Sequence, residues 1–256
     1  MKIQQVRHAT LLIEYGGTRF LIDPMLADKE SQPGFEGTAN SHLRNPLVGL
    51  SLPLERIVDV DAVILTHSHP DHWDDAARAA VPKHLPLFVQ HQADADLIQS
   101  QGFSDVRLLD DDTTFNGVSL TRTPGQHGTD AAMEVIGDFL GEVSGVIFRK
   151  QGEKTLYLAG DTLWNKYIQE NLRVYTPDVV ILNSGDAQVL GIGSITMPKE
   201  DVYEVHKAAP TASLVATHME AVNHTVLSRA ELRGFAVEKD MADLLSVPED
   251  GEICTF

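Results

Sequence analysis

The sequence predicts an α/β fold: a four-layer αββα sandwich in which two mixed β-sheets pack face to face with helices outside. Short apolar runs that end at turn residues occur in both halves of the chain, and such runs are typical of buried strands. Windows with helical character separate these runs. The chain has 256 residues, 43% of them hydrophobic, and no linker or repeat, so we expect residues 1–256 to form one domain.

In the first half of the chain, the expected elements surround a long irregular stretch. Residues 1–6 read as a strand, and a hairpin with glycines at 16 and 17 follows. Residues 25–53 contain several Pro, Gly and Asn residues, and a loop of this length in a compact domain is usually functional. The next expected elements are strands at 62–65, 87–89 and 106–109 and helices at 73–80 and 93–101.

The second half continues this alternation of strands and helices. A second long stretch, residues 124–144, contains four glycines and reads as a loop. Ser228 and Glu231 have the spacing of a capping box, which places the start of the last helix there. The other expected elements are strands at 118–123, 155–159, 179–182 and 212–217 and helices at 165–172 and 196–208.

Three histidines and an aspartate lie within six residues, directly after an apolar strand: His67, His69, Asp71 and His72. Imidazole and carboxylate groups are ligands of zinc, iron and manganese. In an extended segment His67 and His69 point the same way, and Pro70 then turns the chain. Asp71 and His72 can therefore face the other side of a shared cavity. The cluster indicates a transition-metal site in a strand-to-helix loop, and a solvated histidine-rich loop is the alternative.

Three further strands of the predicted fold also end in a potential metal ligand. These ligands are His127 after the strand at 118–123, Asp161 after 155–159, and His218 after 212–217. Together with the first cluster they make a dinuclear site the economical interpretation. His224 lies six residues after His218 and is the alternative last ligand. We expect it instead to support a ligand or to face the substrate.

With these residues the chain resembles the metallo-β-lactamase superfamily of metal-dependent hydrolases. The resemblance runs from the hairpin at 16–24 through the signature loop at 66–72 to His218. It implies one metal ion on His67, His69 and His127, a second on Asp71, His72 and His218, and Asp161 as the bridge. Residues 6–10, 23–26 and 193–197 are similar to the ascorbate-6-phosphate lactonase-like group and to the phospholipase D that cleaves N-acyl-phosphatidylethanolamines.

These ligands favour a metal-dependent hydrolase with two divalent ions, zinc first and manganese or iron as alternatives. The chain has no Gly-x-Ser-x-Gly motif, and its one cysteine, Cys254, lies at its end. We therefore expect a metal-bridging hydroxide to attack a small-molecule ester, lactone or phosphoester. Asp71 or Asp161 would take the remaining proton of the hydroxide. His224 would assist catalysis by facing the substrate or by supporting a ligand. An iron-containing redox enzyme and a non-catalytic metal-binding protein are the alternatives.

The charge and hydropathy of the chain exclude several other classes of function. The net charge is −17 and no basic cluster is present, so we expect no nucleic-acid partner. Two metal ions would still make the cavity locally positive, so an anionic small molecule is compatible with this composition. No apolar run is long enough for a transmembrane helix, and the first residues do not form a signal peptide. The expected compartment is the cytoplasm.

Four residues outside the ligand set are candidates for supporting roles. Asp23 ends the hairpin, and we expect it to orient a ligand imidazole; an ordinary turn aspartate is the alternative. His8 lies on the first strand and is expected to be a core or edge histidine rather than a ligand; the resemblance implies, as the alternative, that it borders the pocket. His42 and Arg44 lie in the first long stretch and would meet an anionic substrate group if that stretch is a lid; solvated loop residues are the equal alternative.

Overall fold

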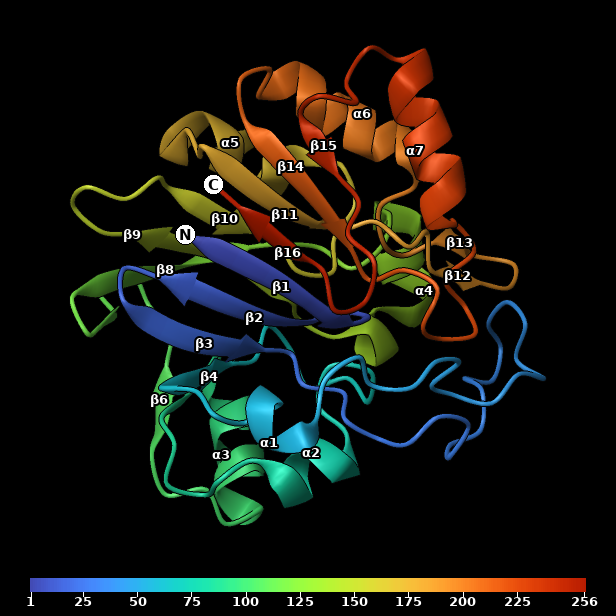
Figure 1. Ribbon diagram of the computed structural model, residues 1–256. Coiled ribbons are helices and arrows are strands. Elements are labelled where there is room, and N and C mark those ends of the chain that lie inside the picture. The colour runs from blue at the N-terminus through green and yellow to red at the C-terminus, as the bar shows by residue number, and fades with distance from the viewer.

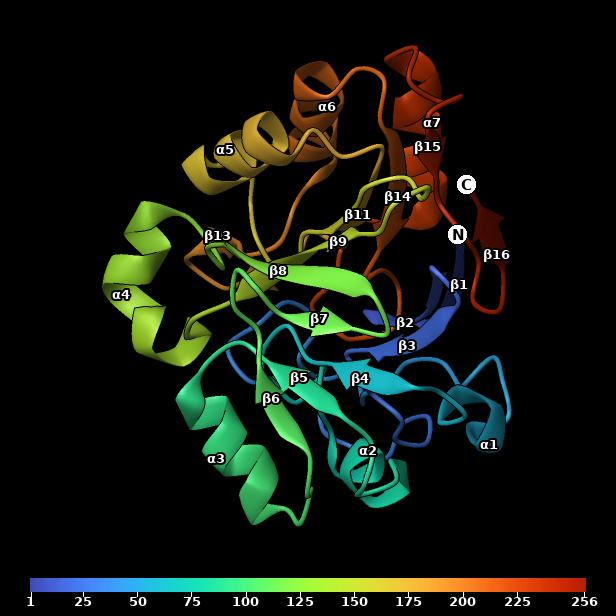
Figure 2. The same ribbon diagram turned by 90° about the vertical axis from the view of Figure 1, so that its left-hand side faces the viewer.

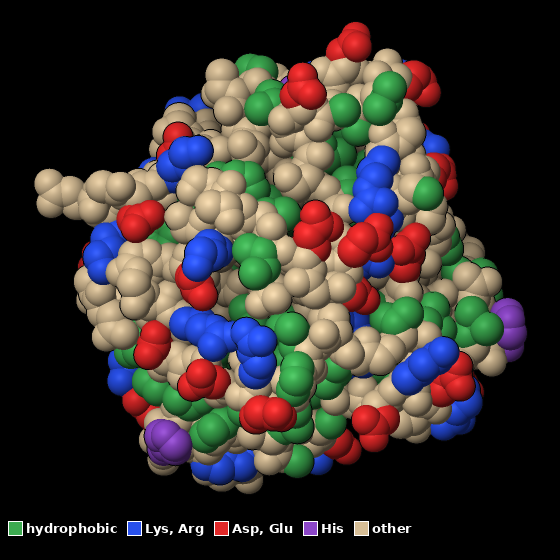
Figure 3. Space-filling view, in the orientation of Figure 1, with side chains coloured by type: hydrophobic (Ala, Val, Ile, Leu, Met, Phe, Trp, Pro, Cys, Tyr) green, Lys and Arg blue, Asp and Glu red, His purple; other side chains and the backbone are tan.

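The computed structural model describes all residues from 1 to 256 and contains two seven-stranded mixed sheets with helices on their outer faces (Figure 1). The predicted αββα arrangement is therefore confirmed. Three helices cover each sheet, and a seventh, α4, stands at one end of the sandwich (Figure 2). On the face shown in Figure 3, acidic and basic side chains are interspersed.

The first sheet has the strand order β16-β1-β2-β3-β4-β5-β6. Its strands are β1 (Lys2–Arg7), β2 (Thr10–Tyr15), β3 (Thr18–Ile22), β4 (Ala62–Ile64), β5 (Leu87–Val89), β6 (Val106–Leu108) and β16 (Ile253–Thr255). The pairs from β3 to β6 are parallel, and the pairs that involve β1 and β2 are antiparallel. Strands β1, β3 and β4 therefore run in the same direction and end at one edge of the sheet.

The second sheet has the order β15-β14-β11-β10-β9-β8-β7. Its strands are β7 (Thr114–Phe115), β8 (Val118–Pro124), β9 (Ser144–Arg149), β10 (Leu156–Leu158), β11 (Val179–Asn183), β14 (Ser213–Thr217) and β15 (Leu245–Ser246). A small hairpin, β12 (Gln188–Val189) and β13 (Gly193–Ser194), lies outside both sheets. The strands predicted at 118–123, 155–159, 179–182 and 212–217 all belong to this sheet.

The helices follow the start signals that the sequence contains. Helices α1 (Leu54–Ile57), α2 (Asp75–Ala80) and α3 (Gln92–Ser100) cover the first sheet, and α5 (Lys166–Tyr175), α6 (Lys199–Ala208) and α7 (Arg229–Glu238) cover the second. The side chains of Asp74, Asn165 and Ser228 cap the N-termini of α2, α5 and α7. The longest helix has 11 residues, and none is both long and apolar enough to cross a membrane.

Alternation along the strands builds the apolar layers. In β3, Phe20 and Ile22 join the core between the sheets, whereas Leu21 faces the helices. In β10, Leu156 and Leu158 join the same central core, whereas Tyr157 packs under α5 and α6. Successive side chains of a strand point to opposite faces, so each sheet buries apolar surface on both sides. This packing gives the strand ends a rigid support.

The two long stretches differ from each other. Residues 25–53 contain neither a helix nor a ladder strand, as predicted. The expectation of a loop over 124–144 is wrong, because helix α4 (Asp130–Leu140) occupies most of it. Thr129 accepts a hydrogen bond from the backbone N–H of Ala132 and so caps this helix. The glycines of this stretch indicated a loop, but two of them precede the helix and Gly141 ends it with a φ of 67°.

We predict that Phe148→Ala lowers the free energy of unfolding by about 3–5 kcal/mol, the usual cost of truncating a buried phenylalanine. Phe148 is fully buried between the sheets, and its ring lies 5.7 Å from that of Tyr15 and 5.4 Å from that of Phe20. Urea denaturation measures the change. Val237→Ala, at a side chain that is 68% exposed on α7, is the control and should change little. A loss below about 1 kcal/mol in Phe148→Ala would contradict this packing.

Candidate metal centre

The predicted ligands lie where strands of both sheets end. The signature loop follows β4 of the first sheet, whereas His127, Asp161 and His218 follow β8, β10 and β14 of the second sheet. One oxygen, Asp161 Oδ2, lies at the centre of the group. It lies 3.3 Å from His72 Nε2, 3.4 Å from His218 Nε2, 3.5 Å from His127 Nε2 and 3.9 Å from His67 Nε2. A single carboxylate oxygen therefore faces imidazoles from both sheets.

The structure brings all seven predicted ligands together in overlapping groups. Within each group the donor atoms lie no more than 4.8 Å apart. The groups are His67 with His69 and His127, Asp71 with His72, His218 and His8, and Asp161 with His67 and His72. The first two contain the ligands that the resemblance implies for two separate ions, and Asp161 lies between them. His8 is the only additional member.

The protonation of these groups differs across the cluster. Burial lowers the pKa of His67 well below its ordinary value and that of His127 to about 4, so both imidazoles are neutral. Burial alone would raise the pKa of Asp161, but the imidazoles of His218 and His72 hold it well below its usual range. Neutral imidazoles and ionised carboxylates are the forms that bind metals. Burial opposes the charge on His72 and His218, but Asp161 raises the pKa of His72 well above its ordinary value and that of His218 to about 9, so both pair as cations with the buried carboxylates. A divalent cation bound there would replace these protons and pair with the same carboxylates, so the donor set fits divalent cations.

Outer contacts fix the orientation of four candidate imidazoles. The ring N–H that faces away from the centre donates in each case to a protein oxygen. These pairs are His67 Nδ1 with Thr66 Oγ1 (3.1 Å), His69 Nε2 with the Phe139 carbonyl (3.1 Å), His72 Nδ1 with Asp23 Oδ2 (2.9 Å) and His127 Nδ1 with the Ile195 carbonyl (2.8 Å). Such bonds leave the lone pair of the other ring nitrogen free for a metal ion.

Hydrogen bonds from Thr66 and His72 hold the Asp23 carboxylate in place. Its Oδ1 accepts the backbone N–H of Thr66 at 2.7 Å, and its Oδ2 accepts the Thr66 hydroxyl at 2.7 Å. Oδ2 also accepts the Nδ1–H of His72. The expectation that Asp23 orients a candidate ligand imidazole is confirmed, and the alternative of an ordinary turn aspartate is excluded.

His8 contributes more than the sequence analysis expected. It is fully buried, as a core histidine should be, but it also adjoins the centre. Its Nε2–H donates to Asp71 Oδ2 at 3.1 Å, and its ring centroid lies 3.7 Å from that of His218. The alternative implied by the resemblance is therefore the better description: His8 directly follows β1, and β1 ends at the same sheet edge as β4.

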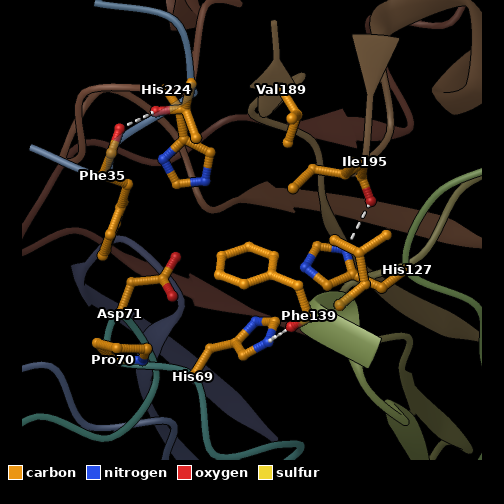
Figure 4. A pocket seen from close by; sticks show the side chains of 11 residues that line it. Phe35, His69, Pro70, Asp71, His127, Phe139, Val189, Ile195 and His224 are labelled. Carbon is orange, nitrogen blue, oxygen red and sulfur yellow. Dashed lines mark hydrogen bonds between the residues drawn. The ribbon is translucent and has the colours of Figure 1, made fainter. Parts of the chain in front are cut away.

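The two histidines near the C-terminal end of β14 occupy different places. His218 joins the cluster, and its Nε2 lies 3.4 Å from Asp161 Oδ2. His224 belongs to none of the ligand groups and lines a cavity instead, with its ring perpendicular to that of Phe35 at 5.1 Å. The geometry therefore favours His218 as the ligand, with His224 above the centre (Figure 4).

The cavity has a volume of about 140 Å³ and opens onto the candidate ligands His69, Asp71 and His127. Its walls are mainly apolar, with Phe35 from the first long stretch, Phe139 and Leu140 from α4, and Val189 and Ile195 from the segment of β12 and β13 (Figure 4). No Lys or Arg lines it. His42 and Arg44 do not reach it: both are exposed, and Arg44 donates to the carbonyls of Glu30 and Ser31. Of the two expectations for these residues, the structure favours solvated loop side chains over contact with the substrate.

We predict that Asp23→Ala weakens metal binding by about 10–100-fold, because His72 loses the acceptor that orients its ring. Competition with a chromophoric chelator measures the affinity. Asp59→Ala removes a carboxylate that is 85% exposed and serves as the control, with wild-type affinity expected. Wild-type metal affinity in folded Asp23→Ala would show that His72 needs no such support.

Comparisons with known proteins agree with this geometry. Residues 18–219 match the family model described as a beta-lactamase superfamily domain. The protein YddR of the UPF0173 family, from Bacillus subtilis (strain 168), is 46% identical over the full length of both chains.

Two solved structures are also similar along the whole chain. The isothiocyanate hydrolase from Delia radicum gut bacteria is 48% identical, with a TM-score of 0.97 over 100% of this chain and 99% of that one. A possible metal-dependent hydrolase from Veillonella parvula DSM 2008 is 43% identical, with a TM-score of 0.98 at the same coverage. The chain belongs to the metallo-β-lactamase superfamily of metal-dependent hydrolases.

Proposed function

We propose that this protein hydrolyses small, uncharged, apolar electrophiles, with isothiocyanates as the favoured class. The observation that carries this proposal is the cavity, which combines apolar walls with a floor of candidate metal ligands and contains no cationic side chain. A volume of about 140 Å³ is close to that of cavities that bind benzene. The 48% identity to an isothiocyanate hydrolase supports the same class.

The seven clustered donors would hold two divalent ions. His67, His69 and His127 would bind one ion, Asp71, His72 and His218 the other, and Asp161 would lie between them. Bound ions would supply an acidified water and polarise the heteroatom of the substrate. Zinc suits the imidazole-rich set best, and the carboxylates also suit manganese or iron.

The side chains around the cavity would then guide the proton and the substrate. In the net reaction the water oxygen bonds to the central carbon of R–N=C=S, the carbon–nitrogen bond to R–NH breaks, and both water protons end on the nitrogen. The products are an amine and carbonyl sulfide. Asp71 lines the cavity and would accept the first proton. His224 points into the cavity from the opposite side and would donate a hydrogen bond to the substrate (Figure 4).

The apolar walls would bind the substituent of the substrate and exclude water. Phe35 and Phe139 face this space from different segments of the chain. Neutral esters and lactones of the same size would meet the same requirements and form the second candidate class. A phosphoester fits less well, because the cavity offers no Lys or Arg to its charge outside the metal centre.

We predict two bound ions per chain and chelator-sensitive release of amine from allyl or benzyl isothiocyanate. The measurement combines metal analysis with a panel of isothiocyanates, esters, lactones and phosphodiesters of matched size. His69→Ala and Asp71→Ala should abolish turnover without unfolding the protein, because each removes a candidate ligand. Fewer than one ion per folded chain after metal repletion would overturn the proposal, as would full activity in either variant.

We predict that His224→Phe lowers kcat by about 10²-fold or more, because the substrate loses its hydrogen-bond donor while the cavity keeps an aromatic wall. Metal content should stay unchanged, since His224 belongs to no ligand group. His42→Phe replaces an exposed histidine of the first long stretch and is the matched control. Equal kcat values in the two variants would remove His224 from the reaction.

A further inference from the structure

Asn223 immediately precedes His224 and is 1% exposed. It does not line the cavity, and it lies in none of the candidate ligand groups. Its side chain instead meets the long stretch at 25–53, which contains no helix or ladder strand of its own. The side-chain amide of Asn223 therefore contacts the part of that stretch that borders the cavity.

All hydrogen-bonding positions of the Asn223 side chain are used. Its Oδ1 accepts the backbone N–H of Phe35 at 3.0 Å and the Nδ2–H of Asn45 at 2.8 Å. Its Nδ2 donates to the Ala39 carbonyl at 2.7 Å and to Thr38 Oγ1 at 2.8 Å. Two acceptor and two donor bonds complete the capacity of a carboxamide.

The backbone of Asn223 makes two more bonds to the same stretch. Its N–H donates to Asn45 Oδ1 at 2.8 Å, and its carbonyl accepts the Nδ2–H of Asn40 at 3.2 Å. Six hydrogen bonds thus join a single residue to residues 35–45. An asparagine with this many partners fixes both its own rotamer and the path of the opposing chain.

These bonds place the cavity wall relative to the histidine that faces it. Phe35 and Thr38 are the two cavity-lining residues of the long stretch, and both bond directly to Asn223. The next segment is tied in as well, because Gln188 donates its N–H to the His224 carbonyl and accepts the N–H of Ala39, each at 3.0 Å. The Asn223 amide therefore joins the wall that carries Phe35 to the chain that carries His224, and Gln188 adds bonds to both.

We infer that Asn223 is a positioning residue that sets the width of the apolar cavity and thereby selects the length of the substrate substituent. Removing its side chain leaves the Phe35 N–H without a partner and the Ala39 carbonyl with only the Thr38 hydroxyl at 3.5 Å. The bonds between residues 37–39 and the β12 segment remain, but none of them reaches Phe35. The wall that carries Phe35 then moves outward, while the metal centre keeps its ligands. This inference rests on the proposed function.

The test compares Asn223→Ala with Asn171→Ala in metal-loaded protein. Asn171 is also a buried asparagine, 3% exposed, with Nδ2 donating to the Pro124 carbonyl and the Tyr157 hydroxyl. It therefore reproduces the loss of a buried amide without touching residues 35–45. The measurements are kcat and KM for n-alkyl isothiocyanates from methyl to hexyl, bound metal, and amide hydrogen exchange.

In Asn223→Ala we expect KM for the shortest substrate to rise tenfold or more, with kcat within about threefold of wild type. The preference in kcat/KM should shift toward longer chains, and the metal content should not change. Exchange of the amides in residues 35–45 should accelerate at least tenfold. Asn171→Ala should lower the melting temperature but keep the wild-type chain-length preference and the wild-type exchange in residues 35–45.

An unchanged chain-length preference in Asn223→Ala would overturn the inference, as would a loss of kcat that is equal for all substrates. If the wild-type protein hydrolyses no isothiocyanate, the proposed substrate class fails, and hydrogen exchange alone decides the positioning role. Wild-type protection of residues 35–45 in Asn223→Ala then overturns it. Asn223→Asp, which keeps the acceptor and loses both donors, replaces Asn223→Ala if the alanine variant does not fold.

Discussion

One carboxylate is buried among imidazoles from both β-sheets, and this contact constrains the strand ends that carry them. Asp161 Oδ2 lies 3.3–3.9 Å from four imidazole nitrogens, three of which follow strands β4 or β14. A buried charge is costly unless it is paired, so this arrangement needs partners whose positions are fixed. The core between the sheets provides that rigidity, and the strand ends bring the donors together. Such an arrangement of donors can hold a metal centre.

The cavity and the metal centre are built from the same residues. The carbonyl of Phe139 accepts the Nε2–H of His69, and the carbonyl of Ile195 accepts the Nδ1–H of His127. The side chains of Phe139 and Ile195 also line the cavity. A shift of either wall would therefore disturb a candidate ligand, whereas the wall placed by Asn223 shares no such bond. We expect substrate selection to depend on the wall that carries Phe35, because that wall can change without altering the centre.

The sequence allowed the metal centre to be predicted because its residues are chemically unusual and follow recognisable strands. Helix α4 was missed because its glycines outweighed the cap at Thr129. His8 and Asn223 had no local signal of comparable strength, since their decisive partners lie far away in the chain. His8 contacts Asp71, 63 residues away, and Asn223 contacts Asn45, 178 residues away. The similarity to the ascorbate-6-phosphate lactonase-like group stays a prediction, because the family and the fold do not define the substrate.

In the proposed function, two divalent cations would lie on either side of Asp161 beneath the apolar cavity. Anomalous diffraction from crystals of the zinc-loaded protein tests it most directly. We expect two anomalous peaks, one among His67, His69 and His127 and the other among Asp71, His72 and His218, with Asp161 between them. A single peak in fully loaded protein, or peaks away from these residues, would contradict it.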